Sequence, residues 1–243
     1  MTEISLAAEP IFKIGNINIS NSLLTTWLVI LTLIILVIIN YSKIRIIPKG
    51  ITNFFESIVE MLFNLVESVT NDRKKALEFL PFIGTFFIFI VFNNWFGLVP
   101  GVGTILINNG EHVVPLLRGG NADLNSTLAL AVVSVVATQY YGMKHIGFVK
   151  HWKKYFSFFP NLIMGFVGVL EFLGEFSKMV SFSFRLFGNI FAGEVLLIVI
   201  AFLAPLIAPI PFFGLEIFVG LVQALVFSML TLVFLTIATA EHH

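Results

Sequence analysis

The longest apolar stretch of the chain runs from Pro160 to Pro205 and has the sequence PNLIMGFVGVLEFLGEFSKMVSFSFRLFGNIFAGEVLLIVIAFLAP. It contains no internal proline and no strong turn dipeptide. As one helix it would measure ~66 Å, whereas the hydrocarbon core of a bilayer is ~30 Å thick. The stretch is therefore either one strongly tilted helix or two spans broken near Gly174–Ser183. We favour the tilted helix, because the break lacks turn residues.

The composition is typical of a polytopic membrane protein. The 243 residues are 58% hydrophobic and 12% charged, and the mean hydropathy is +0.98. The absence of cysteine excludes a disulfide framework and a thiolate metal site. The sequence contains neither a phosphate-binding glycine loop nor a His-Glu-x-x-His zinc pair. We therefore expect no nucleotide, metal, other cofactor or nucleic acid to bind, and we expect His145 and His151 to be loop residues.

Hydropathy predicts an all-α fold in which residues 1–243 form one membrane domain. Residues 1–20 lack a cleavable signal pattern, so we expect the first span to remain as an anchor. Asp123 heads a run typical of a helix cap. The expected elements are upright spans at about 23–40, 79–99 and 126–143, an amphipathic helix at about 51–70, and a tilted antiparallel hairpin of about 160–203 and 214–240, joined by a proline-rich turn at about 204–214.

The predicted helix at 51–70 has an acidic polar face. Its apolar residues recur at steps of three and one, and the gaps hold Asn53, Glu56, Glu60, Asn64 and Glu67. A helix bound to anionic lipid normally carries a basic polar face. We therefore expect this helix to pack under the bundle or against another subunit, although a helix that merely rests on the membrane remains an alternative.

The distribution of Lys and Arg predicts the orientation. The segments 43–75 and 144–154 hold most of these residues, whereas Lys13 and Arg118 lie in segments expected on the opposite side. The positive-inside rule then puts the N-terminus outside, and both basic segments and the C-terminus in the cytoplasm.

Arg185 is the most costly residue of the long apolar stretch. A charged side chain at the bilayer centre costs from ~3 kcal/mol on insertion scales to ~10 kcal/mol or more for an isolated helix. Arginine does not avoid this cost by losing its proton. It must therefore meet water, a carboxylate or a partner subunit, which indicates a functional site in an ion path.

Polar residues on the long helix share faces. At about 100° per residue, Glu171, Lys178 and Arg185 repeat every seven positions and lie on one face. Asn189 lies one turn beyond Arg185 on that face, and Glu194 lies on the opposite side. A simple Glu171–Lys178 ion pair remains an alternative to a role in transport.

An antiparallel hairpin would bring polar residues of its two helices together. In two antiparallel helices, the residue numbers of two facing positions add up to a roughly constant value. This register puts Glu194 beside Glu216 and Arg185 beside Gln223. Gln223 has the alternative of simply bonding another helix, and the same structural reading is favoured for Asn93 and Asn94 in the second span.

The segment Ser183–Glu194, SFRLFGNIFAGE, resembles the signature of subunit a of bacterial F-type ATP synthase, the membrane stator of the proton-driven rotor. The resemblance extends to Glu171, to Ala122–Leu128 and to Gln223-Ala224, and it covers nearly the whole chain. The Arg-Leu-Phe-Gly-Asn core is the specific part.

The resemblance implies roles for individual residues. Arg185 would be the essential arginine that faces the carboxylates of a ring of c subunits, with Asn189 as its neighbour and Gln223 as its polar partner. Glu194 would line a half-channel open to the outside. Some members have histidine at the position of Glu216, so this chain has a carboxylate pair where they have a mixed pair.

The resemblance also implies a place in a complex. The chain would form two offset half-channels against the rotating c ring, with Glu171 on the proton path, and would couple proton flow to ATP synthesis without binding nucleotide itself. Its partners would be the c ring, the subunit b stator stalk and the rest of the synthase, in a bacterial inner membrane. The alternative is a secondary ion-coupled transporter with an Arg–Glu site at its midplane, a class that usually shows internal repeats; we find none here.

Overall fold

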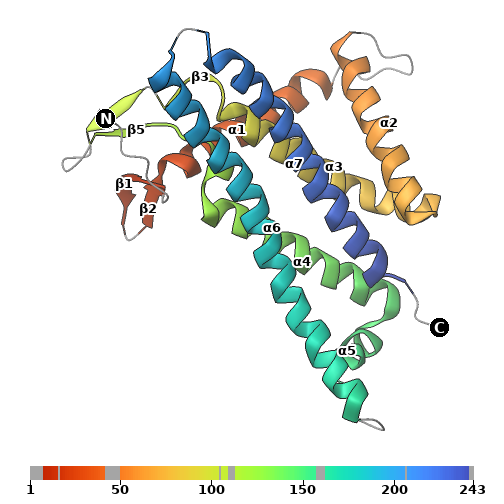
Figure 1. Cartoon of the computed structure of the whole chain (residues 1–243). Coiled ribbons are helices and arrows are strands. Elements are labelled where there is room, and N and C mark those ends of the chain that lie inside the picture. Colours follow the sequence, from red (N-terminus) through yellow and green to blue (C-terminus); the bar gives the residue numbers. More distant parts are fainter. Residues whose placement is uncertain are drawn as a thin grey trace.

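The computed structural model describes residues 8–15, 17–41, 50–103, 105–108, 113–156, 162–205 and 207–240. These residues form long helices and two small antiparallel sheets, β1-β2 and β4-β5 (Figure 1). In chain order the elements are β1 (Pro10–Ile14), β2 (Ile17–Ser20), α1 (Asn21–Tyr41), α2 (Ile51–Thr70), α3 (Arg73–Phe96), β3 (Pro100–Gly103), β4 (Leu106–Asn108), β5 (Val113–Pro115), the 3-10 helix η1 (Gly120–Ala122), α4 (Leu124–Ile146), α5 (Phe148–Phe156), α6 (Leu162–Leu203) and α7 (Pro209–Ala238).

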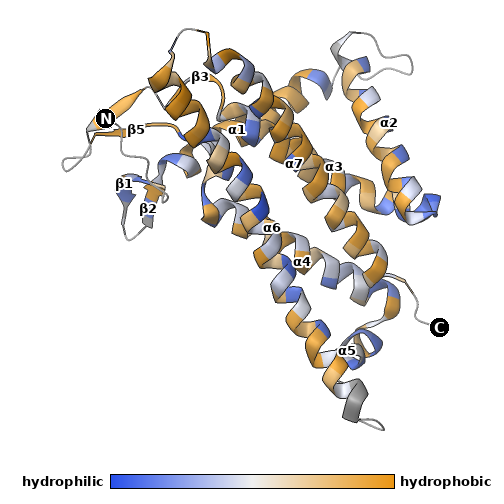
Figure 2. Cartoon of the chain, in the orientation of Figure 1, coloured by the Kyte–Doolittle hydropathy of each residue, from blue (hydrophilic) through white to orange (hydrophobic). Residues whose placement is uncertain are grey.

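Five helices within the described residues are long and apolar enough to cross a membrane: α1, α3, α4, α6 and α7. Figure 2 shows that hydrophobic residues predominate along α6 and α7, whereas hydrophilic residues recur along α2. The prediction of an all-α polytopic membrane protein is confirmed.

The long apolar stretch forms a single helix. α6 contains 42 residues, so it is ~63 Å long, and it continues through the region where a break was the alternative. α7 runs antiparallel beside it (Figure 1). The predicted turn at 204–214 was too long, because α7 begins at Pro209. Proline is accepted in the first turn of a helix, where its missing N–H would have no intrahelical partner.

The second span begins earlier than predicted. α3 begins at Arg73 rather than near 79, because the Asp72 side chain accepts hydrogen bonds from the backbone N–H groups of Lys74 and Lys75 at 2.8 and 3.4 Å. The cap predicted for the third span is confirmed: the Asp123 side chain accepts from the N–H of Asn125 at 3.0 Å.

The prediction of loop positions for the two histidines was wrong. His145 lies in the last turn of α4, where a basic residue interacts favourably with the helix dipole. Gly147, with φ +91°, ends that helix. His151 lies in α5 and is buried, with its Nε2 2.6 Å from Oε1 of Gln139 on α4. α5 escaped prediction because it is only nine residues long.

α2 packs on the bundle through its apolar side. Leu62 and Val66 are fully buried, in clusters that include residues of α3 and α7, whereas Glu56 and Glu60 on the acidic face are exposed. This arrangement is the first of the two alternatives that the sequence left open.

The packing of α6 fixes which of its sides faces outward. Phe182 and Leu186 are buried against α7, where the Phe182 and Phe227 rings lie 5.3 Å apart. The hydroxyl groups of Ser183 and Thr127 of α4 are 3.1 Å apart. With this side of α6 buried in the bundle, the neighbouring side chain of Arg185 is left exposed.

Candidate functional site

Arg185 is exposed on α6, a helix whose residues are mostly apolar. The same helix carries large exposed apolar side chains, among them Leu173, Phe176, Val180 and Phe184. No carboxylate within the described residues forms an ion pair with Arg185. The guanidinium is therefore available to a group outside this chain.

Two further predicted residues lie near this guanidinium. Gln223 of α7 and Arg185 line the same small recess, as the predicted register requires. Asn189 is exposed one turn farther along α6. The outward side of the hairpin thus combines a cation and an amide on α6 with an amide on α7.

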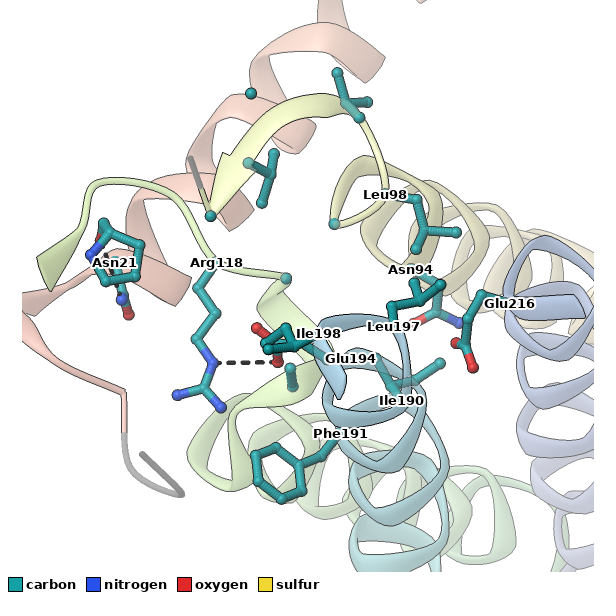
Figure 3. A pocket seen from close by; sticks show the side chains of 18 of the residues that line it. Asn21, Asn94, Leu98, Arg118, Ile190, Phe191, Glu194, Leu197, Ile198 and Glu216 are labelled. Carbon is teal, nitrogen blue, oxygen red and sulfur yellow. Dashed lines mark hydrogen bonds and ion pairs between the residues drawn. The ribbon is translucent and has the colours of Figure 1, made fainter. Parts of the chain in front are cut away.

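The two carboxylates of the hairpin line the same cavity. Glu194 and Glu216 line one cavity of about 390 Å³ between α3, α6, α7 and the loop before η1 (Figure 3). Glu216 is only 5% exposed. Its carboxylate lies directly over Gly193, where an added Cβ would overlap it. Glycine at this position is therefore what lets the α7 side chain approach the α6 backbone.

Arg118 is a site residue that the sequence analysis missed. Its Nε lies 3.4 Å from Oε2 of Glu194, and its side chain is only 7% exposed. Its guanidinium carbon lies 5.6 Å from the centre of the Phe191 ring. Sequence reasoning treated Arg118 only as a charge on the outer side. The available signal was that it is the only Lys or Arg between Lys75 and Lys144.

Three asparagines form a buried hydrogen-bonded chain beside the cavity. Asn93 donates to Asn121 at 2.8 Å, Asn121 donates to Asn94 at 2.7 Å, and Asn94 donates to the carbonyl of Gly220 at 2.8 Å. Asn94 thus forms the hydrogen bond to another helix that was favoured for it, and Asn93 bonds to η1. Because these hydrogen bonds link α3, η1 and α7, they hold the walls of the cavity in place relative to one another.

Glu171 lies at the other end of α6. It is 14 residues from Arg185, or ~21 Å along the helix, whereas Glu194 is ~14 Å from Arg185 in the opposite direction. Lys178 pairs with Glu175, at 2.6 Å between Nζ and Oε1. The alternative of a Glu171–Lys178 ion pair is therefore not observed, because Lys178 pairs with Glu175, which lies three residues away on the same helix.

Glu171 and Glu175 lie near the short helix α5. Burial raises the pKa of the Tyr155 hydroxyl, and the negative charges of Glu175 and Glu171 add to the increase. Carboxylates therefore lie on both sides of Arg185 along α6, one group in the cavity and the other next to α5.

Comparison with known proteins gives consistent matches. Residues 23–236 match the family described as ATP synthase A chain. The chain is 34% identical to the chloroplastic ATP synthase subunit a of Stigeoclonium helveticum, with 100% of this chain and 94% of that protein aligned. It is 34% identical to ATP synthase subunit a of Gloeobacter violaceus, over 95% of this chain and 89% of that protein. It is 32% identical to the chloroplastic ATP synthase subunit a of Oedogonium cardiacum, with 100% of this chain and 92% of that protein aligned.

Proposed function

Since the chain belongs to the ATP synthase A chain family, the proton-translocating and non-catalytic membrane subunit of F-type ATP synthase, we propose that it forms two offset half-channels against a rotating ring of c subunits. It is a multi-pass membrane protein of that complex. The proposal concerns how its residues guide protons to and from the ring.

The observation that carries the proposal is the exposed guanidinium of Arg185. A cation exposed on an apolar helix is costly in lipid, and none of the described carboxylates offsets this cost by pairing with it. A carboxylate of the c ring would supply the missing negative charge. Asn189 and Gln223 would provide polar neighbours for that pair.

The outer half-channel would be the cavity that holds Glu194 and Glu216. A proton from outside passes by way of these carboxylates to a ring carboxylate and neutralises it. Once neutral, the ring carboxylate turns through lipid, which its charged form does only at a high cost.

The inner half-channel would lie at the Glu171 end of α6. After nearly a full turn, the ring carboxylate releases its proton there, and Arg185 stabilises the resulting anion by its opposite charge. The fixed cation also repels other cations between the two half-channels and so prevents a leak. Each charge that crosses 100 mV yields ~2.3 kcal/mol, so several protons are needed for each ATP.

We further propose the subunit b stator stalk as a partner, alongside the c ring and the rest of the synthase. The membrane would be a bacterial inner membrane, with the N-terminus outside and the C-terminus in the cytoplasm. The alternative of a secondary transporter receives no support, because the family match extends over most of the chain.

The test is the replacement of Arg185 in the assembled complex. Arg185→Ala should abolish proton-driven ATP synthesis while the subunit still co-purifies with a ring of small two-helix proteolipids. The matched control is Arg73→Ala, since Arg73 is 74% exposed and its pair with Glu67, at 3.8 Å, contributes ~1 kcal/mol or less. Normal synthesis by Arg185→Ala, at a normal level of the subunit, would refute the proposal.

A further inference from the structure

The two hairpin carboxylates of the cavity, Glu194 and Glu216, have different surroundings. Glu194 is paired with Arg118, at 3.4 Å between Oε2 and Nε. Within the described part of the chain, Glu216 receives neither a hydrogen bond nor an ion pair. In Figure 3 Glu194 points toward Arg118, whereas Glu216 extends from α7 on the other side of α6. Two acids that share one cavity are thus chemically distinct.

The position of Arg118 is fixed by its neighbours. Its backbone N–H donates to the hydroxyl of Thr25 on α1 at 3.2 Å, and its guanidinium lies over the Phe191 ring. Shortly after it in the chain, Asn121 is held by two buried hydrogen bonds. A buried cation held this firmly keeps its carboxylate partner in place, since separating the pair would leave an uncompensated charge.

From this geometry we infer that Arg118 is a positioning residue of the outer half-channel, which holds Glu194 as a fixed anion and leaves Glu216 as the carboxylate that carries the proton. The inference rests on the proposed function and narrows it: of the two carboxylates placed on the entry path, only Glu216 would bind and release the proton, while Glu194 would line the path as a fixed charge.

The physical reason is competition for the proton. Two carboxylates that approach each other tend to share one proton and hold it tightly. A nearby cation keeps one of them ionised and turned away, so that the other binds and releases the proton alone. The charged groups that line the cavity within the described residues are Glu9 from the segment before β1, Arg118, Glu194 and Glu216.

The test measures proton-driven ATP synthesis as a function of the proton concentration outside, with the inner pH held constant. In Arg118→Gln the released Glu194 would share its proton with Glu216. The maximal rate should then fall about fivefold or more, and the half-saturating outer proton concentration should fall about threefold or more. Arg118→Lys keeps the charge but loses the Nε donor and the planar contact with the Phe191 ring, so both quantities should lie between those of the native protein and those of Arg118→Gln.

Two further variants separate positioning from a purely structural role. Adding Glu194→Gln to Arg118→Gln removes the competing carboxylate, so the half-saturating concentration should return toward the native value. The matched control is Arg73→Gln, an exposed arginine with an acidic partner outside the cavity. A structural defect would instead lower the maximal rate and leave the half-saturating concentration unchanged.

The inference is overturned if Arg118→Gln lowers only the maximal rate, or if the double variant keeps the altered half-saturation. Should Arg118→Gln fail to assemble, Glu216→Gln must reduce the rate about tenfold more than Glu194→Gln, and equal losses would overturn the inference. Arg185→Ala is measured alongside. If Arg185→Ala abolishes ATP synthesis while the Arg118 variants contradict expectation, only the assignment of different roles to Glu194 and Glu216 is refuted, and the proposed function stands.

Discussion

Gly193→Ala tests the contact between α6 and the carboxylate of Glu216. The new methyl group would occupy the space that the Glu216 carboxylate fills, so the carboxylate has to move. Overpacking of this kind costs ~1–3 kcal/mol. If that cost is added to the activation barrier for proton entry, the rate of proton-driven ATP synthesis should decrease by about 5- to 150-fold, since ~1.4 kcal/mol corresponds to a tenfold change in rate.

The assay is ATP synthesis in energised membrane vesicles, normalised to the amount of assembled subunit. Gly174→Ala is the matched control on the same helix, because a Cβ there meets nothing within 4 Å. Adding Glu216→Asp, which shortens the acid by one methylene group, should recover part of the rate lost in Gly193→Ala. Native synthesis by Gly193→Ala, or a larger loss on adding Glu216→Asp, would contradict the reasoning.

Two other predictions concern the hairpin. Replacing both Glu194 and Glu216 by glutamine should slow proton flux through the assembled complex about tenfold or more, because the outer cavity then lacks both hairpin carboxylates; unchanged flux would remove both residues from the path. Cysteines at positions 185 and 223 should form a crosslink in this naturally cysteine-free chain, whereas a 185–216 pair should not, since Glu216 is ~10 Å farther along α7. A 185–216 crosslink without a 185–223 one would refute the register.

Much of the architecture follows from local patterns. Hydropathy located the membrane helices, because a span requires about 20 consecutive apolar residues whatever surrounds it. Asp123 was recognised as a cap from its neighbours in sequence. The helix ends were less predictable. The start of α3 depended on the side chain of Asp72, and the start of α7 on prolines that suit a first turn as well as a loop.

The candidate site was also predictable from sequence only in part. Periodicity and the antiparallel register paired Arg185 with Gln223 and Glu194 with Glu216, because a regular helix fixes its own faces. The Lys178–Glu175 pair was missed, since side-chain reach selected a residue three positions away over one seven positions away.

The sequence by itself determined that a charge, Arg185, lies within a long apolar helix, because charge and hydropathy are properties of the residues and their spacing. Only the tertiary structure decided that Arg118 pairs with Glu194 while Glu216 lies over Gly193. Arg118 and Glu194 are 76 positions apart, and no local pattern encodes a contact made by folding a loop back onto a distant helix. Long-range packing therefore gave the two acids of one cavity their different surroundings.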